Sequence, residues 1–116
     1  MPHERILDEN TAAFVVADAF PVSPGHALVI PRRHVASYFD LTDCEVQAVH
    51  ELLCRARQRL DRACEPCGYN VGVNIGEAAG QTVLHVHVHL IPRYSRDVPD
   101  PEGGVRNVIP GKGRYR

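Results

Sequence analysis

The sequence of 116 residues lacks the features that would direct it to a membrane or to a polyanion. No apolar run approaches the roughly 18 residues that a membrane-spanning helix needs. The first ten residues, MPHERILDEN, are charged rather than apolar, and the net charge of −1 gives no global attraction to nucleic acid or anionic lipid. No repeat or low-complexity tract interrupts the chain. We therefore expect one cytoplasmic domain without a nucleic-acid or membrane partner, in which any anion recognition is local.

Cysteine is scarce, with four in the chain and none before Cys44. No secretion signal accompanies these cysteines, so we expect reduced thiols. Cys64 and Cys67 form a lone C-x-x-C pair. A structural zinc site would need a second ligand pair at a suitable spacing, and none lies nearby in the sequence. We interpret the pair as small apolar residues near the end of a helix.

Short apolar runs separated by proline, glycine and polar residues indicate a small domain of mixed structure. The composition and alternation of these runs predict strands over residues 12–19, 26–31, 69–76 and 82–93, with a further short strand near Ile6. Short links between neighbouring strands favour antiparallel pairing. The sequence therefore predicts an α+β fold, in which one long amphipathic helix packs on an antiparallel β-sheet.

The helix is predicted to follow Thr42, because Thr42 and Glu45 match the S/T-x-x-E capping box. Apolar residues recur at helical spacing at positions 46, 49, 53, 56, 60 and 63. Pro66 and Gly68 end the segment after about twenty residues. The four arginines at positions 55, 57, 59 and 62 are interleaved with acidic residues, so we interpret them as a solvated helix face.

Three histidines, His85, His87 and His89, alternate with apolar residues. Residues two apart on a strand share a face and lie about 6.6 Å apart, so the three imidazoles line one face while their apolar neighbours face the core. Two chemistries fit this pattern. An H-x-H pair binds zinc or another transition metal, with His26 or Asp18 as a third ligand. Alternatively, one neutral imidazole attacks phosphorus while its neighbours disfavour protonation.

The loop that precedes the histidines favours the phosphate chemistry. It carries Gly76 and Gly80, followed by Gln81 and Thr82. Backbone N–H groups and hydrogen-bonding side chains at the entrance to the histidine face suit phosphate oxygens better than a cation.

A second set of residues suits a nucleoside. Phe14, Val16 and Asp18 share one face of a predicted strand, so an apolar slot for a base ends in a carboxylate that accepts hydrogen bonds from ribose hydroxyls. Asn74 adds a neutral polar group one strand away. A nucleotide uses all of these parts, whereas a bare metal ion does not.

These segments together resemble the histidine triad family. GQTV followed by HVHVHL is similar to the family signature, PGHALVIPRRHV to its earlier strand with an extra histidine, and NIGEAAGQTV to its phosphate loop. VVADAFPVSPGH places Asp18 where the family keeps a ribose-binding acid. The resemblance covers roughly residues 5–94, and the tail segment GGVRNVIP resembles bacterial diadenosine polyphosphate hydrolases.

The resemblance implies a role for each matching residue. His87 would attack the α-phosphorus to form a nucleotidyl-histidine intermediate. His89 and His26 would orient it, and His85 would organise the strand. The implied substrate-binding residues are Val16, Asp18 and Asn74 for the nucleoside, and Gly80, Gln81 and Thr82 for the phosphate or leaving group.

The resemblance also implies a substrate and an assembly. The substrate would be a dinucleoside polyphosphate such as Ap4A or a nucleoside phosphoramidate, cleaved by water or by phosphate, and two sheets would join edge to edge in a homodimer. No protein-bound cofactor is expected, although the substrate can enter as a magnesium complex. Some relatives hold a structural zinc with an N-terminal cysteine pair, which is missing here, so we predict no such zinc. A metal-binding H-x-H protein and a nucleotide-binding adaptor with weak catalysis remain the alternatives.

The tail over residues 95–116 is rich in proline and glycine and has a basic end, so we place the domain core at residues 1–94. The apolar segment VRNVIP predicts that part of the tail docks on this core. Arg106 and Lys112 are candidates for contact with distal phosphates. His3, His34 and His50 have no partner in the motif and are expected to be surface or structural residues.

Overall fold

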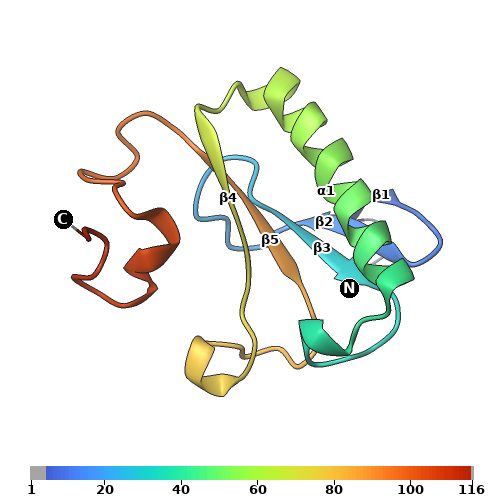
Figure 1. Ribbon diagram of the computed structural model, residues 1–116. Helices are drawn as coiled ribbons and strands as arrows, with labels where there is room; N and C mark the ends of the chain where they lie inside the picture. The colour runs from blue at the N-terminus through green and yellow to red at the C-terminus, as the bar shows by residue number, and fades with distance from the viewer. Residues whose placement is uncertain (1–4, 116) are drawn as a thin grey trace.

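The computed structural model describes residues 5–115, which form one sheet, one long helix and an ordered tail (Figure 1). The strands are β1 (Ile6–Glu9), β2 (Ala13–Ala17), β3 (Ala27–Pro31), β4 (Gly68–Val73) and β5 (Val88–Arg93), the helix is α1 (Asp43–Cys64), and the short 3-10 turns are η2 (Tyr38–Asp40), η3 (Glu77–Ala79) and η4 (Gly104–Val108). All strand pairs are antiparallel, in the order β1-β2-β3-β5-β4. The predicted α+β fold is confirmed, and so is the short strand near Ile6.

The helix begins at the predicted capping box. The Thr42 hydroxyl accepts a hydrogen bond from the Glu45 amide at 3.2 Å, and the Thr42 amide donates to the Glu45 carboxylate at 2.9 Å. Arg33 also donates two hydrogen bonds to this carboxylate, which lowers the pKa of Glu45 to about 2. The helix ends at Cys64, where Glu65 adopts a left-handed conformation before Pro66. Both predicted helix ends are confirmed.

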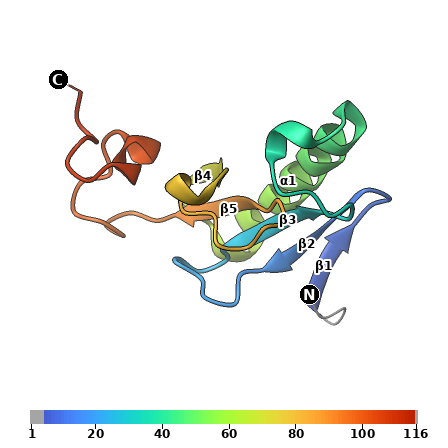
Figure 2. The ribbon, with the colours of Figure 1, turned by 90° about the horizontal axis from the view of Figure 1, so that it is seen from below.

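The helix packs on one face of the sheet, and Figure 2 shows the other face open. The buried cluster between them contains Ala13, Val15, Ala27, Val29, Val49, Leu52, Ala56, Val88 and Leu90. The buried side of the helix differs slightly from the predicted one. Leu52 is fully buried although the predicted stripe did not include it, and Ala63 is exposed although the stripe did include it. Spacings of three and four residues both fit a helix, so periodicity alone does not show which flank of the stripe meets the centre of the sheet.

The last strand is shorter than the sequence suggested. It was predicted over residues 82–93, but β5 begins at Val88. The ladders from both neighbours stop there, because Val29 of β3 and Val73 of β4 each pair with Val88. The preceding Val86 amide instead donates to the Val35 carbonyl at 2.8 Å. β2 and β4 are also shorter than predicted, and they end at Ala17 and Val73.

The helix arginines serve the fold. Arg55 and Arg59 both pair with Asp8 of β1, at 2.7 and 2.9 Å, and these guanidinium groups hold the pKa of Asp8 well below its usual range. Arg57 pairs with Asp61 on the helix itself. None of these three arginines lines the two cavities that contain His87 or His89.

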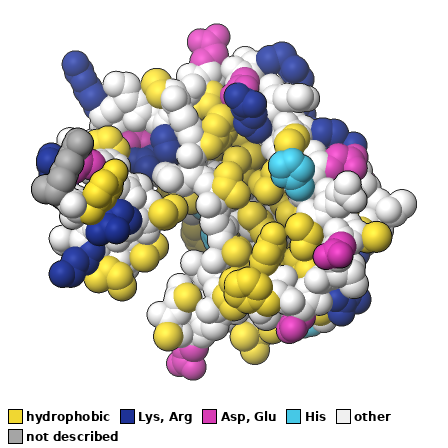
Figure 3. Space-filling model, in the orientation of Figure 1, with side chains coloured by type: hydrophobic (Ala, Val, Ile, Leu, Met, Phe, Trp, Pro, Cys, Tyr) yellow, Lys and Arg dark blue, Asp and Glu magenta, His cyan; other side chains and the backbone are white. Residues whose placement is uncertain are grey.

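The tail leaves β5 and lies beyond the edge strand β4, with η4 against β4 (Figure 1). Figure 3 shows several Lys and Arg side chains gathered on this part of the surface. Across residues 5–115, no helix is long and apolar enough to span a membrane.

Candidate active site

The histidine segment keeps its predicted alternation although only His89 lies in β5. Val86, Val88 and Leu90 are at most 4% exposed, whereas the three histidines that alternate with them are half-buried. Val88 and Leu90 belong to the cluster beneath the helix. The imidazoles therefore lie on the open face, where a substrate can approach.

A backbone carbonyl anchors the first histidine. His85 Nε2 lies 2.7 Å from the Pro31 carbonyl oxygen. Because a carbonyl only accepts hydrogen bonds, Nε2 carries a proton. The His85 ring also contacts His34, with 4.6 Å between the ring centroids. His34 is exposed, as expected of a surface residue, but it does have a neighbour in the motif.

A backbone carbonyl also sets the tautomer of His87. Its Nδ1 lies 2.9 Å from the carbonyl oxygen of His85, so Nδ1 carries the proton. In the neutral ring the lone pair is then on Nε2. A lone pair on Nε2 is what an imidazole needs to attack an electrophile on the open face.

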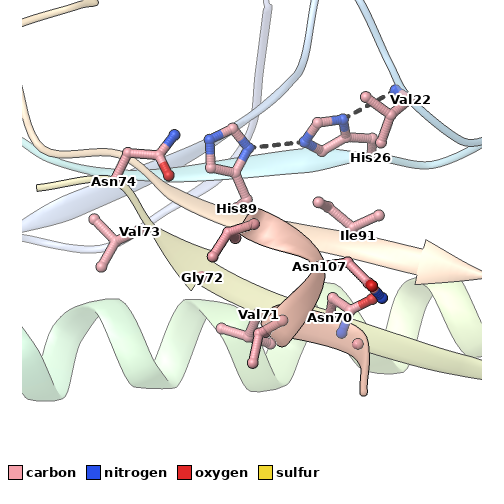
Figure 4. Close-up of a pocket in the computed structure, with 13 residues that line it drawn as sticks. Val22, His26, Asn70, Val71, Gly72, Val73, Asn74, His89, Ile91 and Asn107 are labelled. Atoms are coloured by element: carbon pink, nitrogen blue, oxygen red, sulfur yellow. Dashed lines mark hydrogen bonds between the residues drawn. The ribbon is translucent and has the colours of Figure 1, made fainter. Parts of the chain in front are cut away.

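His89 lies at the end of a directional chain of hydrogen bonds (Figure 4). The Val22 amide donates to His26 Nδ1 at 3.2 Å, which leaves the His26 proton on Nε2. His26 Nε2 lies 2.9 Å from His89 Nδ1, so His26 donates and His89 accepts. The neutral His89 ring consequently carries its own proton on Nε2. His89 and His87 are neighbours, with their ring centroids 5.2 Å apart.

Both histidines of this hydrogen-bonded chain, His26 and His89, favour the neutral form. Burial lowers the pKa of His26, and the nearby Asp18 carboxylate opposes this effect only in part. Burial also lowers the pKa of His89, and repulsion from His87 and His26 lowers it further. A neutral His89 can still donate a hydrogen bond through Nε2, so it can stabilise negative charge on a phosphate oxygen without competing for a proton.

Asp18, His26 and His89 form the one group of ligand atoms, within the described residues, that is close enough to hold a metal ion. Asp18 Oδ2 lies 3.5 Å from His26 Nε2. Of the H-x-H histidines considered from sequence, only His89 belongs to this group, and it lies there with His26 and Asp18, the two third ligands that the sequence offered. Coordination through His26 Nε2 would displace the proton that the Val22 hydrogen bond places there, so the site suits a proton-donating chain better than a cation.

An apolar slot of about 520 Å³ opens beside the nucleophile candidate. Phe14, Leu28 and Ile30 line it together with His85 and His87. The predicted contact of Val16 with the nucleoside is not supported. Val16 is only 1% exposed and is packed in a buried cluster with Leu28 and Ile30. It therefore supports the floor of the slot.

Asp18 lies just past the end of β2, at the His26 end of the histidine chain. One carboxylate oxygen accepts the Phe20 amide at 2.8 Å, and the other faces His26. Asp18 does not line the slot beside His87.

The predicted phosphate loop uses most of its polar groups to hold itself. Gln81 is 7% exposed, and its amide oxygen accepts the Gly76 N–H at 2.8 Å while its nitrogen donates to the Ala36 carbonyl at 2.7 Å. The amide N–H groups of Gly80 and Gln81 donate to carbonyls within the loop. Thr82 is exposed, and neither its amide nor its hydroxyl has a hydrogen bond to another described residue. Thr82 thus offers free donors, whereas Gln81 positions the loop.

Asn74 and His89 line a larger cavity of about 630 Å³ on the β4 side of the histidines. The tail closes part of this cavity through η4. Arg106 does not reach it, because its guanidinium donates to the Lys112 and Gly113 carbonyls and stacks on Tyr115. Lys112 does not line it either. The basic tail residues named from sequence therefore do not line this cavity.

Several residues of the site were not identified from sequence. Leu28, Ile30, Arg32 and His34 all line the slot beside His87. Leu28 and Ile30 follow His26 at intervals of two residues, so the sequence pattern could have placed them on the same face of the sheet as His26. Nothing in the local sequence indicated that His34 contacts His85, since that contact depends on how the chain turns after Pro31. Of the other two histidines outside the motif, His50 is exposed beside Cys54, and His3 lies outside the described residues.

The four cysteines carry free thiols. Cys64 is half-buried at the helix end, and Cys67 is exposed just before β4. The loop between them contributes to neither cavity beside the histidines.

Comparison with known proteins gives a consistent result. A family model described as the HIT domain matches residues 2–96. An uncharacterized HIT-like protein from Mycoplasma pneumoniae is 43% identical over 88 residues, which cover 76% of this chain and 61% of the relative. An AP-4-A phosphorylase from Mycobacterium tuberculosis is 36% identical, over 79% of this chain and 48% of the relative. The asymmetrical bis(5'-nucleosyl)-tetraphosphatase from Schizosaccharomyces pombe is 41% identical, over 75% and 47%.

Solved structures agree with these matches. A HIT family protein from Bacillus anthracis superposes with a TM-score of 0.76 at 35% identity, covering 79% of this chain and 65% of that protein. The NitFhit protein from Caenorhabditis elegans superposes with a TM-score of 0.81 at 34% identity, covering 86% of this chain and 24% of that protein. The chain thus spans less than two thirds of the length of these two proteins and of the relatives above.

Proposed function

Because the chain belongs to the HIT family, confirming the resemblance found in its histidine segment, we propose that it cleaves a nucleotide at the α-phosphorus with His87 as the nucleophile. A single observation carries this proposal. The His85 carbonyl accepts the Nδ1 proton of His87 at 2.9 Å, so the Nε2 lone pair is available on the open face beside the apolar slot.

The proposed reaction has two displacements. His87 Nε2 attacks the α-phosphorus, a new N–P bond forms, and the bond from phosphorus to the leaving group breaks. The ring becomes positively charged, and its Nδ1–H still donates to the His85 carbonyl, which stabilises this charge. Water, or phosphate in a phosphorolytic reaction, then attacks the same phosphorus. This second step releases the nucleotide and restores neutral His87.

The surrounding residues have supporting roles. His89 donates from Nε2 to a phosphate oxygen, and His26 maintains that tautomer. The Thr82 hydroxyl is a candidate contact for the leaving group. Phe14, Leu28 and Ile30 pack against the base.

A dinucleoside tetraphosphate is the proposed substrate, with a nucleoside phosphoramidate as the alternative. The names of the Mycobacterium tuberculosis and Schizosaccharomyces pombe relatives support the tetraphosphate. Products separate the two possible reactions on it, since AMP with ATP indicates hydrolysis and ADP with ATP indicates phosphorolysis.

We also propose that the protein needs no resident metal and that the substrate enters as a magnesium complex. Activity that survives extensive dialysis against a chelator, once magnesium is returned, would support this. A requirement for stoichiometric zinc would instead favour the group formed by Asp18, His26 and His89.

We propose a homodimer in which two β4 strands pair. Within the described residues β4 is an edge strand, and although η4 lies against it, no hydrogen bond joins the backbone of β4 to the tail. Sedimentation of the purified protein tests this, and a monomer at all accessible concentrations would exclude it.

The central test compares His87→Ala with His50→Ala, which changes an exposed histidine on the helix. Each variant is incubated with diadenosine tetraphosphate and with adenosine phosphoramidate, and AMP or ADP release is measured. We expect His87→Ala to lose activity by roughly 10³-fold or more, because the covalent route is removed. His50→Ala should match the unmodified protein. Unchanged turnover in His87→Ala would exclude the mechanism.

A further inference from the structure

A second cavity lies on the other side of the histidines from the base slot. Its volume is about 630 Å³, within the range of about 300–1,000 Å³ that is typical of small-ligand sites. The open face of β4 and β5 forms its floor, and η4 of the tail forms one wall (Figure 4). His89 lines this cavity and His87 lines the base slot, so the two hollows flank the proposed reaction centre.

The lining of this cavity suits a neutral group. It contains no Asp, Glu, Lys or Arg, whereas the base slot includes Arg32. Its apolar surface comes from Ile91 on the open face of the sheet and from Val105 and Val108 on the tail. Such a lining has little to offer a polyphosphate, but valine and isoleucine side chains pack well against the flat face of a base.

Amide side chains supply the polar groups of the cavity. Asn74, Asn70 and Asn107 all line it. The Asn70 oxygen accepts a hydrogen bond from Arg93 at 2.6 Å, which fixes this side chain. Asn74 makes no hydrogen bond to another described residue, so both its donor and its acceptor are available beside His89. Amides of this kind pair with the polar edge of a base or with ribose hydroxyls.

The tail that forms the wall is an ordered loop. Gly103 has a positive φ of 86°, and a Cβ at this position would lie 1.9 Å from the Gly113 carbonyl oxygen. Arg106 bridges to the carbonyl of the same Gly113 at 3.2 Å, and Arg114 pairs with Asp100 at 3.0 Å. These contacts hold the two ends of the loop together and present Val105 to the cavity.

We propose that this cavity binds the second nucleoside of a dinucleoside polyphosphate, the one carried away on the leaving group. The proposal rests on the function proposed above, and it assigns the tail a role in substrate selection. One nucleoside occupies the slot beside His87, the phosphates cross the histidine face, and the other nucleoside packs between β4 and η4. An adenosine tetraphosphate that lacks the second nucleoside would leave this cavity unused.

The test measures kcat/KM for diadenosine tetraphosphate and for adenosine 5'-tetraphosphate, which share the polyphosphate but differ in the second nucleoside. The variants are Val105→Asp and Val108→Asp, with Ile109→Asp as the matched control. Ile109 is 59% exposed in the same loop and does not line the cavity. A carboxylate in the cavity should lower kcat/KM for the dinucleoside roughly tenfold, mainly through KM, and leave the mononucleoside unchanged. Ile109→Asp should change neither value.

The outcomes separate this proposal from the function on which it rests. An equal loss on both substrates, or no loss on either, would overturn the second nucleoside site while leaving the role of His87 intact. If the unmodified protein turns over neither substrate, equilibrium binding decides instead. Val105→Asp should then weaken binding of diadenosine tetraphosphate but not of AMP, and equal binding of the dinucleotide to both proteins would refute the proposal.

Discussion

The two faces of β5 differ in what determines them. Val88 and Leu90 meet the helix in a dry cluster, whereas His89 and the histidines before it meet open space. On the helix face, shape and hydrophobicity are sufficient, because apolar side chains of suitable volume can replace one another at modest cost. On the open face each imidazole has a defined hydrogen-bond partner, and that partner decides which nitrogen carries the proton.

This difference separates stability from chemistry. Changes on the helix face should alter the free energy of unfolding and leave catalysis intact in the folded fraction. Changes on the open face should do the reverse. Four predictions test this division, beginning with the largest effect.

Leu52→Ala should lower the free energy of unfolding by about 2–5 kcal/mol, because Leu52 is fully buried and its removal leaves a cavity. Urea unfolding followed by circular dichroism measures the loss. The half-buried Leu53 provides a matched control, and Leu53→Ala should cost less. Both variants should keep the kcat of the unmodified protein at temperatures where they are folded. A lower kcat in fully folded Leu52→Ala would show that the helix face also shapes the site.

His26→Ala should lower kcat roughly 10- to 100-fold, because His89 loses the donor that fixes its tautomer. His26→Gln should recover part of this activity, since its amide nitrogen can take the place of Nε2. A merely structural role would not change the dependence of kcat on pH, so this profile is the decisive measurement. Identical profiles for His26→Ala and the unmodified protein would contradict the proposed chain.

Thr42→Ala should lower the free energy of unfolding by about 1 kcal/mol, because the helix loses the hydroxyl that caps the Glu45 amide. The cap lies outside both cavities beside the histidines, so kcat and KM should remain unchanged. Thr42→Ser keeps the hydroxyl and should be close to neutral. Thermal unfolding of the three proteins at one pH gives the comparison, and a loss in Thr42→Ser equal to that in Thr42→Ala would rule out capping as the cause.

The smallest expected effect is on the pH dependence of the free energy of unfolding, to which the histidines of the open face contribute. The pKa values of His26 and His89 are lowered from the usual 6.5, so below about this pH the unfolded chain binds more protons than the native protein. Stability should therefore be complete above pH 6.5 and decline as the pH falls below it. The double variant His26→Gln/His89→Gln should show a shallower decline between pH 7 and pH 5 than the unmodified protein, whereas His50→Gln should not. Equal slopes in all three proteins would argue against burial of neutral imidazoles.

Local patterns in the sequence predicted the helix and the face of the histidines. Thr42, Glu45 and Pro66 act through their immediate neighbours, so the ends of the helix are encoded within a few residues. The start of β5 at Val88 was not predictable in this way, because it depends on where β3 and β4 stop pairing.

Residue type predicted the members of the site better than their contacts. The sequence identified His26, His87 and His89, which the fold brings together. It assigned Gln81 to the substrate, whereas in the structure that side chain bonds to Gly76 in its own loop and to the distant Ala36 carbonyl. Contacts of this kind join segments far apart in the chain, and periodicity contains no information about them.

The hydrogen bond from His87 to the main chain has a consequence for how this site can change over evolutionary time. Its acceptor is the carbonyl of residue 85, which every amino acid at that position retains. No side-chain replacement removes it, provided that the local backbone path is kept. Neighbouring positions can therefore be exchanged for new substrates while the reactive nitrogen remains ready, so that mutational robustness of the nucleophile resides in the polypeptide backbone.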